Sequence, residues 1–179
     1  VAGKIQYTNI RPYVGMISQE IDWKTPPASI EGVAAFRQQV GKDGLFKFYG
    51  NFNHSNFSLY NHSISDFSAK YLYDLTNDYR YLNGFYKNTL SEKWSVRGGL
   101  SYNYIQNDAW VEADNIEETE KGIHAKTVLE GSLSDKVELK YGGEIIHRNY
   151  SQYFDLKTGE DYVLGFDELI AAGFAETDI

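Results

Sequence analysis

Four histidines are the residues of this 179-residue sequence best suited to hold a metal ion or to move a proton. They are His54, His62, His124 and His147. None of them forms a His-x-x-x-His motif or a comparable ligand spacing. We therefore expect ordinary strand or loop histidines and no metal site.

A cluster of acidic residues between positions 107 and 121 is the second candidate. Its members are Asp108, Glu112, Asp114, Glu117, Glu118 and Glu120. Carboxylates of this number could bind calcium, but the Asp-x-Asp-x-Asp-Gly spacing that fixes a coordination shell is missing. The pattern favours a solvated loop.

Motifs for covalent or phosphoryl chemistry are absent from the sequence. It has no Gly-x-Ser-x-Gly element, Walker loop or Rossmann fingerprint, and it contains no Cys. Acidic pairs abound, but nothing places two of them in one pocket with different environments, as acid/base catalysis requires. We expect neither an enzyme nor a bound cofactor.

The amino-acid composition excludes further classes of protein. The net charge is -8 and the 17 Lys and Arg residues are scattered singly, which argues against a nucleic-acid partner. An aromatic content of 16% predicts a folded chain. The mean hydropathy of -0.48 does not exclude a membrane protein, because a transmembrane strand exposes only alternate residues to lipid.

Residues 94–104 carry the clearest structural pattern. Every second residue from Trp94 to Tyr104 is aromatic, aliphatic or glycine, while Ser95, Arg97 and Asn103 belong to the other set. A period of two predicts a strand with one apolar and one polar face. The same alternation occurs in residues 30–39, 46–53, 82–90, 123–133 and 137–148, with Val128 and Ile146 as exceptions.

Short and long connections alternate between these predicted strands. Residues 41–44, and the polar tripeptides at the centres of 90–94 and 133–137, predict tight hairpins. Residues 61–79, 107–121 and 154–179 predict long polar connections. In an up-and-down sheet all tight turns then lie at one edge, which is typical of outer-membrane barrels with short periplasmic turns and long extracellular loops.

Aromatic residues lie at both ends of the apolar face. Trp94 is at the turn end of its strand and Tyr102 and Tyr104 are at the far end, so we expect them, with Tyr141, to mark the two membrane interfaces. The opposite face would line a lumen. Its candidate lining residues are Arg97, Glu138, Lys140, Glu144 and Arg148, with charge pairing along the wall as the alternative role.

The first 28 residues have a weaker pattern. Residues 4–13 predict a strand broken at Pro12, and residues 13–23 predict another that ends at Thr25-Pro26-Pro27. Five or six long strands are visible between positions 29 and 153, and eight is the upper count. The sequence starts without a leader and ends in a polar stretch, so we expect a run of hairpins from a larger barrel.

Two segments resemble a known family. Residues 13–60, with Trp23-Lys24-Thr25-Pro26-Pro27, Phe36-Arg37-Gln38, Gly41-Lys42-Asp43-Gly44-Leu45 and Phe48-Tyr49-Gly50, are similar to the early barrel of TonB-dependent outer-membrane receptors. Residues 90–102 are similar to later hairpins of the same barrels. The resemblance implies a 22-stranded barrel that encloses a plug and is energised through a TonB box, and neither plug nor TonB box is present in this sequence.

Residues 1–179 are therefore expected to form a segment of one all-β, antiparallel transmembrane barrel domain in the outer membrane of a Gram-negative bacterium. The resemblance implies import of a scarce nutrient, either a small molecule or an oligomer. The implied partners are outer-membrane lipid, the rest of the barrel and plug, and the TonB system acting through that plug. A complete small barrel with a structural or adhesive role, and a soluble ligand-binding β-barrel, are the alternatives.

Overall fold

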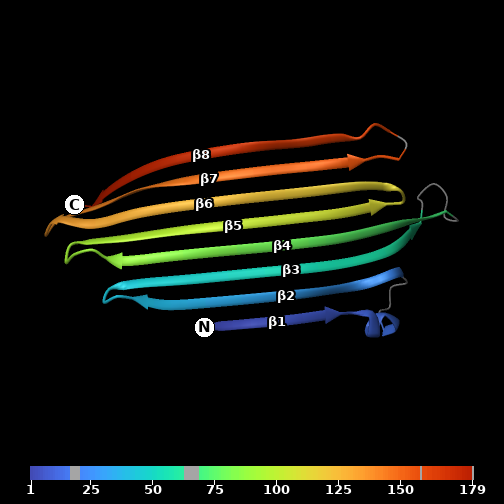
Figure 1. Cartoon of the computed structure of the whole chain (residues 1–179), viewed down its shortest axis with the longest axis horizontal. Coiled ribbons are helices and arrows are strands. Elements are labelled where there is room, and N and C mark those ends of the chain that lie inside the picture. Colours follow the sequence, from blue (N-terminus) through green and yellow to red (C-terminus); the bar gives the residue numbers. More distant parts are fainter. Residues whose placement is uncertain (17–20, 63–68, 158, 179) are drawn as a thin grey trace.

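The computed structural model describes residues 1–16, 21–62, 69–157 and 159–178, and these residues form one antiparallel sheet (Figure 1). Its eight strands follow one another in sequence order, so each strand pairs with the strands before and after it. The strands are β1 (Ala2–Asn9), β2 (Asp22–Val40), β3 (Gly44–His62), β4 (Lys70–Thr89), β5 (Trp94–Val111), β6 (Asp114–Ser134), β7 (Val137–Asp155) and β8 (Tyr162–Asp178). The prediction of an all-β antiparallel fold is confirmed.

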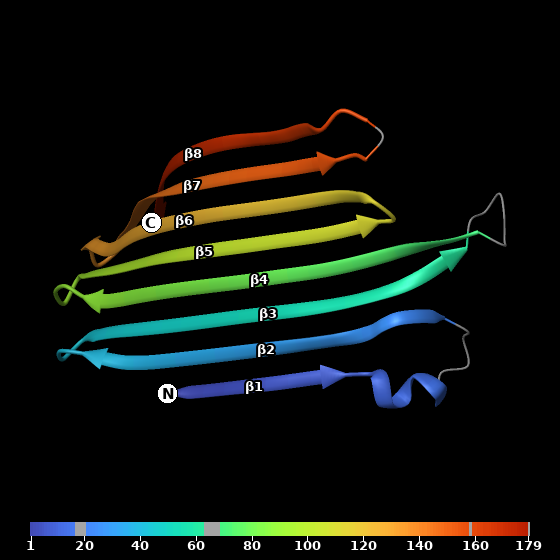
Figure 2. The ribbon, with the colours of Figure 1, turned by 45° about the vertical axis from the view of Figure 1, so that its right-hand side comes forward.

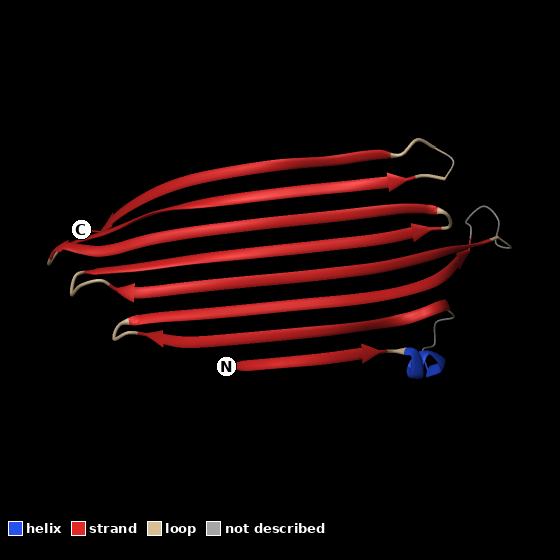
Figure 3. Ribbon diagram, in the orientation of Figure 1, coloured by secondary structure: helices blue, strands red, loops and turns tan. Residues whose placement is uncertain are grey.

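The three predicted tight turns all lie at the same ends of the strands (Figure 3). They connect β2 to β3, β4 to β5, and β6 to β7. Gly41 adopts a φ of 66° in the first of them, a left-handed conformation that glycine reaches without steric cost. The 3-10 helix η1 (Arg11–Met16) lies at the opposite ends of the strands, where the other connections also occur.

Two of the predicted long connections are wrong. The stretch 107–121 is a continuation of β5 and β6, joined by a turn at Glu112 and Ala113, with Glu112 at a φ of 59°. The stretch 154–179 contains β8. The ends of β5 and β6 carry polar side chains on both faces, and β8 carries apolar side chains on both faces, so these segments lack the alternation that marks the other strands.

The prediction for 61–79 is also wrong in its second half, because β4 begins at Lys70. Its centre, residues 63–68, lies outside the described residues.

The N-terminal predictions need three corrections. β1 ends at Asn9, and η1 occupies the residues around Pro12. The strand expected at 13–23 is instead the 3-10 helix as far as Met16, and residues 17–20 lie outside the described part. Pro26 and Pro27 do not end a strand but lie within β2.

An irregular pairing accommodates the two prolines. The register between β2 and β3 shifts between Trp23 and Thr25 and again between Thr25 and Ala28. On its other side β2 pairs with β1 only from Ala28 onward. The prolines, which lack an N–H donor, therefore fall at a bulge with few ladder bonds to lose.

The registers sort the side chains onto two faces. Face A is defined by the even-numbered residues of β3, β4 and β5, and by β2 from Ala28 onward, together with the odd-numbered residues of β1, β6, β7 and β8. Face B is defined by the remaining strand residues. Val128 and Ile146, the two exceptions to the alternation, both lie on face B.

Aromatic rings cover two glycines of face A. The Trp94 ring occupies the position that a Cβ of Gly131 would take, at 2.3 Å, and the Phe52 ring does the same over Gly32. At Gly142 the obstacle is the backbone itself, because a Cβ would lie 2.2 Å from the Thr127 carbonyl oxygen. Glycine at this position therefore permits a close approach between β6 and β7.

The sheet has two open edges. β1 and β8 each have a single neighbouring strand, and no pairing between them occurs in the described residues. Figure 2 shows the strands twisting relative to one another, with the end of β8 curving out of line near the C-terminus. No helix in the described ranges has the length and apolar content needed to cross a membrane.

Replacement of Gly142 by Ala tests the close approach between β6 and β7. We expect a loss of about 1–3 kcal/mol in the free energy of unfolding, because the added methyl must displace backbone. The urea midpoint of unfolding measures this loss. Gly98→Ala is the matched control, since the nearest atom to its Cβ is the Lys126 oxygen at 3.5 Å. Equal urea midpoints for the two variants would contradict the close approach between β6 and β7 at Gly142.

Candidate functional site

An exposed apolar band covers the turn-side half of face A. It runs from the register row of Trp94 to the row of Tyr102, and Tyr104 follows directly above it. Leu100 is 57% exposed, Ile145 53% and Leu169 69%. These side chains have no protein layer over them in the described part of the chain.

The dimensions of the band suit a bilayer. Residues 94–104 rise about 33 Å along the strand at ~3.3 Å per residue. A tilt of about 40° reduces this height to roughly 25 Å, the height of the lipid-facing band of outer-membrane barrels.

The four predicted interface aromatics all lie on face A. Trp94 and Tyr141 mark the turn side, where their rings are 6.4 Å apart with a nearly perpendicular orientation. Tyr102 and Tyr104 mark the loop side. The structure thus places aromatic rings at both borders of the apolar band. Small and aliphatic side chains lie between them on β5 and β6, whereas Phe46, Phe48 and Tyr86 lie within the band on β3 and β4.

The five predicted lining residues all lie on face B, and four of them form ion pairs. Arg97 pairs with Glu130 at 2.7 Å and Lys140 with Glu176 at 3.1 Å. Glu144 contacts both His124 and Lys126, and Arg148 contacts Glu120 at 3.6 Å. Glu138 lies opposite Ser132 and Asp178 in the register. Charge pairing along the wall, the alternative role, is therefore present.

Side chains are packed more closely on face B than on face A. In β3 to β6 all large apolar residues that are more than 40% exposed lie on face A, at 43–59%: Phe52, Leu82, Leu100, Trp110, Ile123 and Leu133. Comparable residues of face B in these four strands, such as Ile105 and Phe85, are half-buried, with Tyr49 at 39% as the exception. The edge strand β8 differs, because Leu164 and Phe166 of face B are 54% and 46% exposed. Crowding on one face is what a sheet produces when it curls toward that face.

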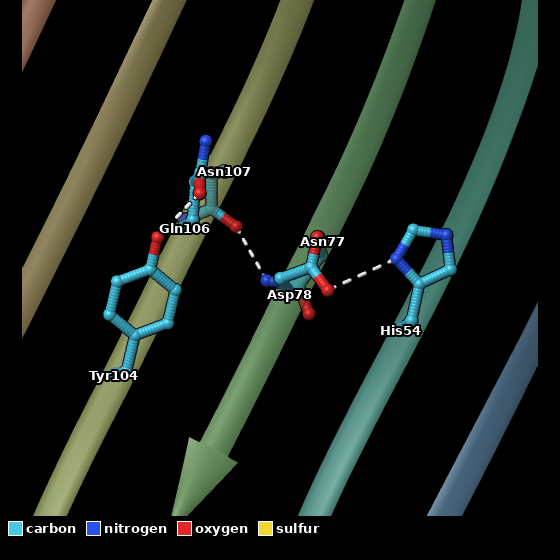
Figure 4. Close-up of polar contacts among 6 residues, drawn as sticks. All are labelled: His54, Asn77, Asp78, Tyr104, Gln106 and Asn107. Atoms are coloured by element: carbon cyan, nitrogen blue, oxygen red, sulfur yellow. Dashed lines mark hydrogen bonds and ion pairs between the residues drawn. The ribbon is translucent and has the colours of Figure 1, made fainter.

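Directly above Tyr104, polar pairs occur on both faces (Figure 4). On face A, His54 contacts Asp78 at 3.1 Å and the Tyr104 hydroxyl donates to Gln106. On face B, Asn77 donates to Asn107 at 2.6 Å. Polar pairs on both sides indicate that water reaches both sides of this half of the sheet.

The histidines and the acidic cluster do not assemble into a site. His54, His124 and His147 contact Asp78, Glu144 and Asp167 respectively, at three separate places. The acidic residues of 107–121 are divided between the two faces. No group of three or more potential metal ligands occurs in the described ranges.

Sequence reasoning missed a row of apolar residues on face B near the loops. Its members are Phe57, Leu75, Ala109, Ile116, Phe154 and Tyr162, one from each strand from β3 to β8. Phe57 also contacts Trp23 and Tyr73, with ring centroids 6.1 and 6.0 Å apart. Within β5 the signal is a change of parity, from even apolar positions up to Tyr104 to the odd positions of Ile105, Ala109 and Val111, with Trp110 as the exception.

The connection between β7 and β8 is held by side-chain hydrogen bonds. The Tyr153 hydroxyl donates to Asp161 at 3.1 Å, and the Lys157 amide donates to Asp114 at 3.0 Å. The hydrogen bond to Asp161, together with partial desolvation, raises the pKa of Tyr153. The tyrosine therefore remains a neutral donor across the physiological pH range.

The fold and its surfaces define an antiparallel β-meander with one exposed apolar face and one ion-paired face. Comparisons with protein-family models, with curated proteins and with solved structures gave no match.

The Arg97–Glu130 pair offers a measurement of the face B ion pairs. A double-mutant cycle with Arg97→Gln and Glu130→Gln should give a coupling energy of about 0.2–1 kcal/mol, because both side chains are partly exposed. The coupling should decrease when the salt concentration increases. A coupling that does not change with salt would contradict the assignment of this pair as an exposed ion pair.

Proposed function

We propose that this chain forms part of the wall of a transport barrel in the outer membrane of a Gram-negative bacterium. The observation that carries the proposal is the apolar band of face A, exposed and bordered by aromatic rings, behind a face B rich in ion pairs. An exposed apolar surface of this extent favours aggregation in water, whereas contact with lipid requires such a surface. The polar surface on both sides above Tyr104 fits strands that project beyond the bilayer.

The open edges support a barrel larger than this chain. Unpaired N–H and C=O groups cost several kcal/mol each in hydrocarbon, so β1 and β8 need further strand partners. A 22-stranded barrel of a TonB-dependent receptor, the family that the hairpins resemble, would supply them. Face B would then face the plug, and import of a scarce nutrient would depend on that plug and the TonB system.

One observation favours a second candidate, a complete small barrel with a structural or adhesive role. Eight strands is the size of the smallest outer-membrane barrels. The soluble ligand-binding barrel has weaker support, because the crowded face of this sheet carries charges, whereas such a barrel places its apolar face inside.

A cysteine scan tests the membrane orientation, and the absence of native Cys keeps the labelling unambiguous. A fluorescent label is attached at Val96→Cys or Leu100→Cys on face A, or at Ser95→Cys or Ser101→Cys on face B, in the membrane-inserted protein. We expect quenching by lipids with brominated acyl chains only for the two face A labels. A label at Gln106→Cys, above the band, should escape this quenching.

The result that contradicts the proposal is equally specific. Face A labels that are shielded both from brominated lipid and from aqueous iodide would indicate a dry protein core and hence a soluble barrel.

Disulfide trapping distinguishes the larger barrel from the complete small one. Ile5→Cys on β1 is combined in turn with Asp167→Cys, Leu169→Cys and Ala171→Cys on β8. The larger barrel predicts that no pair closes within one chain, because Cα atoms more than about 7 Å apart cannot be bridged. Ile145→Cys with Ala171→Cys, which are register partners, is the positive control. Efficient closure of any β1–β8 pair would establish the small barrel.

A further inference from the structure

Two cations on face A lack an acidic partner. In β3 to β8 this face carries three basic residues: Lys70, Arg80 and Lys121. Lys70 pairs with Asp22, whereas Arg80 and Lys121 have no carboxylate at ion-pair distance among the described residues. Both contact the same ring instead, because the Arg80 guanidinium and the Lys121 ammonium lie 5.3 and 5.9 Å from the centroid of Tyr104.

Their place in the sheet is the upper border of the apolar band. Arg80, Tyr104 and Lys121 are direct register partners on three adjacent strands. The row immediately beneath consists of Leu82, Tyr102 and Ile123. Two exposed cations therefore lie side by side at the height where, by the proposed function, the hydrocarbon ends and the headgroups begin.

The nearest carboxylates on face A are occupied by other residues. Asp78, one row above Arg80, contacts His54. Asp167, in the same row on β8, contacts His147 and Asn149. The positive charge of Arg80 and Lys121 is thus not neutralised by the protein, unlike the cations of the face B ion pairs.

A groove leads from Arg80 down the apolar band. It has a volume of about 920 Å³. Gly3, Gly32 and Gly50 form part of its floor, where the Phe52 ring covers Gly32, and Leu82 and Tyr102 contribute to its apolar walls. Arg80 also lines this groove, so one residue belongs to both the apolar and the cationic part.

We propose that this surface binds a phosphate-bearing lipid, with an acyl chain in the groove and the phosphate between Arg80 and Lys121. Guanidinium and ammonium groups are the usual protein partners of phosphate, and the Tyr104 ring positions both. The loop side of the sheet would face the outer leaflet, so the ligand is lipid A. This inference rests on the proposed function, because it requires face A to contact the membrane.

The test measures lipid A bound to the complete polypeptide that contains these strands, in phosphatidylcholine vesicles doped with lipid A. The double variant Arg80→Gln with Lys121→Gln should bind roughly twentyfold less, since each basic residue near an anionic lipid surface contributes about a factor of five. Lys47→Gln with Lys87→Gln removes the same charge from face B and should bind as the unaltered protein does. Lys47 is a close match, because it too lies over an aromatic ring, that of Phe85.

Two further measurements identify the ligand chemistry. Dephosphorylated lipid A should bind as weakly to the unaltered protein as lipid A does to the Arg80 and Lys121 double variant, and inorganic phosphate should not compete at millimolar concentration. Equal loss in both double variants, or none in either, would overturn the proposal. Effective competition by inorganic phosphate would overturn it in favour of a free-anion site.

The orientation is read on the same samples through the quenching of a label at Leu100→Cys by brominated lipid. Quenching without a difference in lipid A binding would refute the lipid site alone. Absence of quenching would refute the membrane orientation and the lipid site together.

Discussion

The hydrogen-bond ladder between neighbouring antiparallel strands is the constraint on which the other features of this structure depend. Each register partner shares a face with its neighbours, so a single pairing decides where side chains from all eight strands meet. A shift of one residue anywhere in the ladder would move charged residues of that strand into the apolar band. The same ladder leaves β1 and β8 with unpaired groups, which is why the surroundings of the sheet matter as much as its interior.

The sheet has almost no core of its own. Val128, 3% exposed, is the one buried hydrophobic residue among those described, and it lies on face B. The apolar residues of face A are spread over one surface and contact each other only sideways. Such a sheet gains little from burying its own side chains, so its stability must come from the ladder and from what covers face A. Ion pairs on face B add specificity of register more than free energy.

Alternation in the sequence was sufficient to predict the strands within the apolar band, their two faces and the three tight turns. Trp94 and Arg97 could be assigned to opposite faces because apolar and polar residues alternate in this part of β5. Beyond Tyr104 this alternation ends, so the ends of β5 and β6 have no periodic signal and were predicted as loops. β8 was also predicted as a loop, because apolar side chains occupy both of its faces. Pro26 and Pro27 were misleading for a different reason, since only the register shows that β1 ends before them.

The partners of individual side chains could not be predicted at all. Arg97 pairs with Glu130, which lies diagonally across the register. The Tyr104 ring contacts two cations from different strands. These contacts depend on pairings between residues far apart in the sequence.

The change of parity near residue 104 of β5 has a mechanical consequence. Up to Tyr104 the apolar side chains of β5 lie on face A, and beyond it Ile105, Ala109 and Val111 lie on face B, with Trp110 as the exception. In the membrane orientation proposed above, a displacement of the whole sheet along its strands by two residues would leave the pattern of faces intact but would carry Gln106 and His54 into the hydrocarbon or expose Trp94 beyond it. The change of parity would then give the sheet one preferred depth in the bilayer and would oppose displacement in either direction.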